Sequence, residues 1–143
     1  MNIINPVLAA CLCLAGGIAQ AEIVIRDAYV RSSAPGAPVG AAFMVIENTS
    51  EVADRLVAAT SPAATRTELH THQSEADGVM KMIEVEGGLE IPAEGSHDLR
   101  RGGDHVMLMG LTKPLPEGGS VPLTLSFERA GDVTIDVPVD LDR

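Results

Sequence analysis

The residues best suited to chemistry are metal donors that occur in pairs two positions apart. In a β-strand, side chains at i and i+2 point to the same face, so each pair presents its donor atoms on one side of its strand. Three such groups follow one another along the chain: His70 and His72; Met80 and Met82; His105, Met107 and Met109.

Thioether sulfur and imidazole nitrogen together suit Cu(I). A hard cation such as Ca²⁺ or Mg²⁺ prefers carboxylate and carbonyl oxygens, and zinc prefers thiolate, imidazole and carboxylate. His105 and Met107 form a two-ligand element within one strand, which one donor from each of two neighbouring strands can complete. The sequence therefore predicts one Cu(I) ion held by His70, Met82, His105 and Met107. Protons should compete for the histidines as the pH falls through about 6.5.

Some assignments within this cluster stay open. His72 replaces His70 if the register of their strand shifts, and Met80 is the alternative to Met82. A methionine on a strand usually fills a core, so Met80 and Met109 are predicted to pack or to lie beside the site. His97, next to Asp98 in a polar turn, is predicted to be exposed to solvent.

The first 21 residues are interpreted as a signal peptide. They carry no charged side chain, run through an apolar stretch at 6–18 and end in Ala-Gln-Ala;. We therefore predict a periplasmic protein whose copper-binding domain spans residues 22–143. A lipoprotein is the less favoured alternative, because Leu-Ala-Ala-Cys at 8–11 resembles a lipobox.

Both cysteines, Cys11 and Cys13, lie in the predicted signal peptide. The domain at 22–143 therefore has no disulfide, no thiolate metal site and no cysteine nucleophile. A blue-copper electron-transfer site, which needs a cysteine ligand, is excluded for the same reason. No G-x-S-x-G or other nucleophile motif is present, so we do not expect an enzyme.

The composition narrows the classes of partner. The net charge is −10 and no basic patch is visible, which argues against nucleic acids and anionic membranes;. With no Trp, one Tyr and two Phe, the chain offers no aromatic platform for bases or sugars;. We expect no membrane insertion of the domain at 22–143.

The elements that must position the donors are short strands. Runs of Val, Ile, Leu and Thr alternate with Gly, Pro, Asn and Asp, and no segment has a sustained helical period. This pattern predicts an all-β single domain, a sandwich or small barrel. The predicted strands are Ile23–Arg31, Val39–Glu47, Arg55–Ala59, Arg66–His72, Val79–Val85, Leu89–Ile91, His97–Arg100, His105–Leu111, Val121–Phe127 and Val133–Val137.

The donor cluster resembles the periplasmic copper chaperones that serve the CuA site of cytochrome c oxidase, the PCuAC-type family. The family pattern is a histidine, ten residues, a methionine, twenty-one residues, then H-x-M. Here eleven residues separate His70 from Met82 and twenty-two separate Met82 from His105, and both additions can be placed in turns, near 74–77 and at 86–88. The segments 27–31, 35–43 and 46–48 also look like the opening of that family.

The resemblance implies a cupredoxin-like Greek-key β-barrel or sandwich, a monomer, and transfer of Cu(I) to a copper-accepting oxidase subunit or its assembly factor. We accordingly predict a periplasmic copper chaperone. The alternatives are a copper sequestration protein for tolerance, with the same ligands, and a metal-free β-sandwich interaction module.

Overall fold

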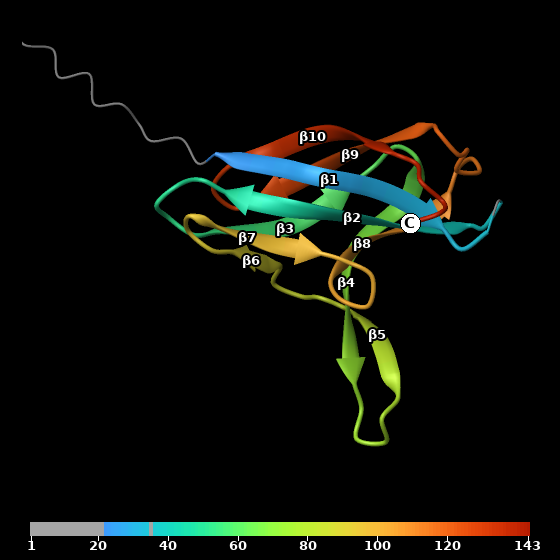
Figure 1. Ribbon diagram of the computed structural model, residues 1–143, viewed down its shortest axis with the longest axis horizontal. Coiled ribbons are helices and arrows are strands. Elements are labelled where there is room, and N and C mark those ends of the chain that lie inside the picture. The colour runs from blue at the N-terminus through green and yellow to red at the C-terminus, as the bar shows by residue number, and fades with distance from the viewer. Residues whose placement is uncertain (1–21, 35) are drawn as a thin grey trace, which may run out of the picture.

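The computed structural model describes residues 22–34 and 36–143 (Figure 1). The predicted signal peptide at 1–21, with both cysteines and the lipobox alternative, lies outside these residues. The described chain forms ten strands, which are β1 (Ile23–Ser32), β2 (Val39–Asn48), β3 (Asp54–Thr60), β4 (Ala64–Ser74), β5 (Met80–Glu84), β6 (Leu89–Ile91), β7 (Gly95–Leu99), β8 (His105–Leu111), β9 (Ser120–Phe127) and β10 (Gly131–Pro138).

The strands form two antiparallel sheets. The larger has the order β1-β2-β8-β4-β5, with β7 also paired to β2, and the smaller has the order β10-β9-β3-β6. A parallel bridge between Val30 and Val139 brings the C-terminal segment alongside β1. This is the single-domain all-β sandwich that the sequence predicts, and each predicted strand is present with bounds that differ by a few residues.

The core lies between the sheets and comes almost entirely from aliphatic side chains. In β9 the residues Val121, Leu123, Leu125 and Phe127 are buried while their neighbours are not, as expected for a strand with one buried face;. In β8 the same alternation buries Val106 and Leu108 and leaves the intervening residues on the outer face of the larger sheet. The core therefore fixes which way the histidine and methionines of β8 point.

The β4–β5 hairpin projects from the sandwich (Figure 1). Its strands pair without interruption from His70 opposite Glu84 to Ser74 opposite Met80. The turn closes with two backbone hydrogen bonds, from Glu75 N to the Val79 carbonyl and from Gly78 N to the Glu75 carbonyl. The predicted strand ended at His72, but the observed one continues to Ser74 because β5 supplies a partner for two more residues.

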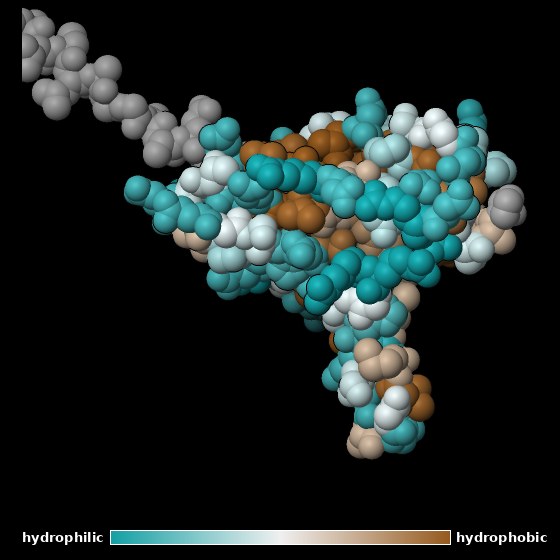
Figure 2. Space-filling model, viewed as in Figure 1, coloured by the Kyte–Doolittle hydropathy of each residue, from teal (hydrophilic) through white to brown (hydrophobic). Residues whose placement is uncertain are grey.

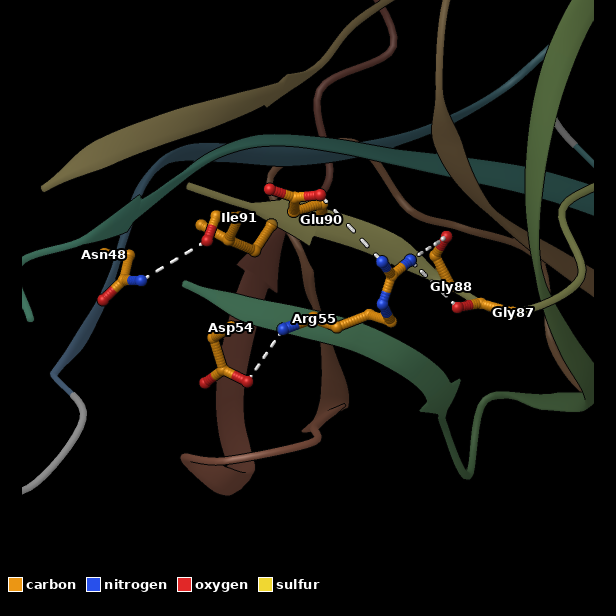
Figure 3. A network of polar contacts seen from close by, with 7 residues as sticks. All are labelled: Asn48, Asp54, Arg55, Gly87, Gly88, Glu90 and Ile91. Atoms are coloured by element: carbon orange, nitrogen blue, oxygen red, sulfur yellow. Dashed lines mark hydrogen bonds and ion pairs between the residues drawn. The ribbon is translucent and has the colours of Figure 1, made fainter. Parts of the chain in front are cut away.

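Polar contacts fix the return of the chain from β5 to β6 (Figure 3). The Arg55 side chain donates hydrogen bonds to the carbonyls of Gly87 and Gly88, at 3.2 and 3.4 Å. Gly88 has a positive φ of 81°, and a Cβ added there would clash with the Leu56 carbonyl oxygen, so a side chain does not fit;. The base of the hairpin is thereby anchored to β3.

In the view of Figure 2, hydrophilic side chains dominate the surface of the sandwich with apolar patches between them, and further apolar side chains lie on the hairpin. Val79, Met80 and Met82 account for the exposed large apolar side chains there. None of the described residues forms a helix long and apolar enough to cross a membrane.

Candidate metal centre

The candidate metal centre lies on the outer face of the larger sheet, where β8 and β4 run side by side. His70 pairs with His105 and Glu68 pairs with Met107. Leu69 and Val106, which also pair with each other, point into the core instead. Directly opposed residues of antiparallel strands have adjacent side chains, so the two histidines lie side by side.

The hairpin strand β5 adds Met82 to this face. Met82 pairs with His72, which lies two residues along β4 from His70 and so on the same side of the sheet;. Met82 and Met107 both line a surface cavity of about 360 Å³, together with Phe43 and Ala41 of β2. The four predicted ligands, which come from three strands, therefore share one face.

His70 is oriented by a carboxylate. The residue is 8% exposed, and its Nε2–H donates a hydrogen bond of 2.8 Å to Oε2 of Glu68. The other carboxylate oxygen, Oε1, is paired with Nε of Arg66 at 2.7 Å. Among the described residues, Nδ1 of His70 is the buried side-chain atom without a hydrogen-bond partner. A buried nitrogen with a free lone pair is unfavourable unless something binds it, which fits a metal ligand.

His105 is oriented the opposite way. It is 2% exposed, and its Nδ1–H donates to the Gly103 carbonyl at 3.0 Å, which leaves Nε2 with no hydrogen bond to any residue that the structure describes. Burial lowers the pKa of His105 below the ordinary value of 6.5; the hydrogen bond to Gly103 opposes this effect, and His70 and His72 add to it. The neutral ring, which is the ligand form, is favoured.

His105 lies at the centre of a group of rings. Its centroid is 5.9 Å from that of His70, 5.6 Å from that of His72 and 5.9 Å from that of Phe43. Both candidates for the first histidine are therefore near His105. The free buried nitrogen of His70 favours His70 as the ligand, and His72 lies closer to the solvent.

Met80 does not fill the core, because the residue is 56% exposed on the hairpin, which leaves its other expected role, beside the site. The expectation for His97 is wrong. His97 is not solvent-exposed but half-buried, because its Nε2 pairs with the Asp104 carboxylate at 2.7 Å. Met109 does lie beside the site, with its sulfur 3.3 Å from Nη2 of Arg66.

The role of Glu68 was only partly visible in the sequence. Its position two residues before His70 puts its side chain on the same face of the strand, but the hydrogen bond that fixes the ring depends on the rotamers of both side chains;. The Gly103 carbonyl that orients His105 lies in the turn between β7 and β8, and no side-chain pattern marks it.

Comparison with known proteins decides the family. Residues 23–139 match the family described as "Putative lipoprotein LpqE-like". The chain belongs to this family. A relative from Leifsonia xyli subsp. xyli, "Putative lipoprotein Lxx21020", is 36% identical over 117 residues, which cover 82% of this chain and 69% of the relative.

Solved structures extend the assignment to PCuAC domains. The copper-bound PCuAC domain from PmoF2 is 27% identical with a TM-score of 0.69, over 83% of this chain and 92% of that domain. The solution structure of CuI-DR1885 from Deinococcus radiodurans is 35% identical with a TM-score of 0.63, over 87% of this chain and 83% of that one. The PCuAC-type resemblance inferred from the sequence is thus confirmed. The chain belongs to the LpqE-like family, and its fold matches that of PCuAC domains.

Proposed function

We propose that this LpqE-like protein binds one Cu(I) ion through His70, Met82, His105 and Met107 and delivers it to a copper-accepting protein of the cell envelope. The observation that carries the proposal is the buried, partnerless Nδ1 of His70 next to His105, whose Nε2 is free. Two imidazoles are thus held by acceptors on opposite nitrogens, and each presents the other nitrogen as a donor. The likeness to two copper-bound structures supports the choice of metal.

The donor set suits temporary binding. All four ligands are neutral, so Cu(I) keeps its full positive charge, and the Glu68 carboxylate behind His70 offsets part of it. Thiolate is a stronger donor to Cu(I) than thioether or neutral imidazole. An acceptor with cysteine ligands can therefore take the ion by exchanging one ligand at a time.

The unequal burial of the donors gives such an acceptor a route to the ion. His70 and His105 are buried, whereas the Met82 side chain is 42% exposed and lines an open cavity. A partner reaches the ion from the methionine side while the histidines still hold it. We propose a copper-accepting oxidase subunit or its assembly factor as this partner, and a role without catalysis.

The family name bears on location. The family and the Leifsonia relative are both described as putative lipoproteins. These names support an exported envelope protein and favour the lipobox alternative, in which Cys11 carries the lipid, over the signal peptide cleaved after Ala21.

Copper binding is tested by titrating Cu(I) into the purified protein against a chromogenic Cu(I) chelator, in parallel with the variant His105→Ala plus Met107→Ala. We expect one tightly bound ion in the wild-type protein and a large loss of affinity in the variant. Equal affinity in both proteins would end the proposal.

Delivery is tested separately in a strain that lacks the gene. A chaperone predicts reduced oxidase activity that added copper restores, with copper sensitivity unchanged. Raised copper sensitivity with normal oxidase activity would instead establish sequestration as the function.

A further inference from the structure

We call the proposed Cu(I) site formed by His70, Met82, His105 and Met107 the resident site. It does not explain why Met80 and His72 lie beside Met82. Resting on the proposed function, we propose that these three side chains form an outer, transient Cu(I) site on the β4–β5 hairpin. The ion passes through this outer site on its way into and out of the resident site. Nothing in the resident set of four ligands requires Met80 or His72.

The register places the three donors on one face. His72 pairs directly with Met82, and Ser74 pairs with Met80. Met80 and Met82 are two residues apart on β5, so both point to the side of the sheet that carries His72. Met80 is the diagonal neighbour of His72, at a distance that long side chains can bridge. One imidazole and two thioethers are thus available to the same ion.

The exposure of Met80 marks it as a donor without a structural task. Its side chain is 56% exposed, and the hairpin that carries it projects from the sandwich (Figure 1). A methionine that filled a core would be buried, so Met80 has no packing role in the sandwich. Its three rotatable side-chain bonds let the sulfur meet an ion from solvent and turn inward with it.

Two donors link the outer site to the resident one. Met82 belongs to both sets, and the His72 ring lies 5.6 Å, centroid to centroid, from the His105 ring. Exposure decreases along this path, from Met80 at 56% to Met82 at 42% and His105 at 2%. The ion therefore moves from a solvated to a buried set of ligands without leaving its donors.

The transfer is a ligand exchange with a simple balance. As the bond from Cu(I) to Nε2 of His105 forms, the bond to Met80 breaks; next, the bond to His70 replaces that to His72, and Met107 then adds as the fourth ligand. Copper stays Cu(I) throughout, every donor is neutral, and no proton or electron is gained or lost. Release to an acceptor follows the same steps in reverse.

The decisive variant is Met80→Leu, which keeps an apolar side chain of similar volume and removes the sulfur. Cu(I) is supplied as its acetonitrile complex and uptake is followed by stopped flow; release is followed with a chromogenic chelator. Since one donor is lost from the exchange transition state, both rates should fall, by about tenfold. They should fall by the same factor, so the equilibrium affinity changes much less than the rates do.

Val79→Ala is the matched control, because Val79 is the equally exposed neighbour at 54% and carries no donor. Its rates should equal those of the wild-type protein. No partner protein is present in these measurements, so a role of the hairpin in docking cannot change the rates. Unchanged rates in Met80→Leu would overturn the proposal. An affinity loss in Met80→Leu as large as that in Met82→Leu would also overturn it, because Met80 would then be a resident ligand.

A second measurement isolates the outer site. In His105→Asn plus Met107→Leu, X-ray absorption at the copper edge should show Cu(I) bound weakly with two sulfur neighbours, and adding Met80→Leu should remove one of them. Sulfur scattering that does not depend on Met80 would contradict the outer site. If the wild-type protein bound no Cu(I), the proposed function itself would be wrong. If the wild-type protein bound Cu(I) and Met80→Leu had wild-type rates of uptake and release, only the outer site would be wrong.

Discussion

At the scale of single residues, the central feature is the pair of histidines held in opposite orientations. Glu68 accepts from Nε2 of His70, and the Gly103 carbonyl accepts from Nδ1 of His105. Each ring is fixed before any ion arrives, so binding requires little ordering of these side chains. The sequence could predict which residues are donors, because their types and spacing are explicit. It could not predict which nitrogen of each ring is free, since that depends on rotamers and on a backbone carbonyl.

Glu68→Gln tests the orientation of His70. An amide can present NH₂ as well as oxygen towards the ring and no longer pairs with the Arg66 guanidinium, so the Nδ1 donor becomes less well placed. Loss of such an orienting carboxylate lowers metal affinity by about 10- to 100-fold. Competition with a Cu(I) chelator measures the Cu(I) affinity of the variant and of the wild-type protein.

Glu84→Gln is the matched control for this variant. Glu84 lies opposite His70 on β5, is exposed, and forms no hydrogen bond or ion pair with a described side chain. Removing its charge should leave the affinity close to the wild-type value. Equal losses in both variants would show that overall charge, not the hydrogen bond, supports His70.

The lowered pKa of His105 predicts a loss of stability in acid. Because the pKa of the folded state lies below 6.5, the unfolded chain binds more protons than the folded protein as the pH falls through that value;. The free energy of unfolding of the copper-free protein should therefore decrease on acidification from about pH 7 to about pH 5. The same shift means that protons displace Cu(I) from His105 only at a lower pH than for an ordinary histidine.

Urea denaturation at several pH values, on wild-type protein and His105→Asn, measures this effect. The asparagine keeps a donor for the Gly103 carbonyl and does not titrate in this range;. The wild-type stability should fall more steeply with acid than that of the variant. Parallel curves would show that His105 does not contribute to the pH dependence.

At the scale of elements, β8 does two tasks with alternate residues. Val106 and Leu108 are buried in the core, and His105 and Met107 face the metal site. Strand alternation is a strong sequence signal, so the position of β8 and the direction of its ligands could be predicted. The pairing of β4 with β8 and β5 could not, because it depends on long-range contacts.

Leu108→Ala tests how far the core supports the site. Leu108 is 1% exposed, and its truncation should lower the free energy of unfolding by about 3 kcal/mol, since the cavity cannot fully collapse;. Val57→Ala in β3, whose valine is 46% exposed, should change it by less than about 0.5 kcal/mol;. Equal effects of the two substitutions in urea denaturation would contradict the assigned core.

The β4–β5 hairpin shows how a small departure from the family spacing can be absorbed. The extra residue between His70 and Met82 leaves the pairing of the two strands continuous, from His70–Glu84 to Ser74–Met80. The turn at 75–79 joins them. Met82 therefore stays on the same face of the sheet as His70 and His72. The sequence alone left open which of these two histidines is the ligand.

At the scale of the whole molecule, the sandwich carries one projecting element, the β4–β5 hairpin (Figure 1). The buried histidines belong to β4 and β8 and the exposed Met80 and Met82 to the hairpin strand β5, so the candidate metal centre has a buried half and a more accessible half. The composition predicted the class of fold, and the family resemblance predicted its architecture. The projection of the hairpin was not predictable, because it depends on how far β4 and β5 extend beyond the sheet.

The exposed thioether of Met82 raises the question of whether a second copy completes the site. Four donors are already present on one face of one chain, and the net charge of −10 disfavours association of two copies;. We predict a monomer with and without Cu(I), with one ion per chain. Sedimentation equilibrium measures the mass, and a dimer that forms only with copper would contradict this prediction.

The most direct test of the account is the copper K-edge absorption spectrum of the protein loaded with one equivalent of Cu(I). Two nitrogen and two sulfur neighbours are predicted, with one nitrogen lost in His70→Leu and one sulfur lost in Met107→Leu. A first shell that contains no imidazole nitrogen, or one that neither substitution changes, would contradict the convergence of these side chains on one ion.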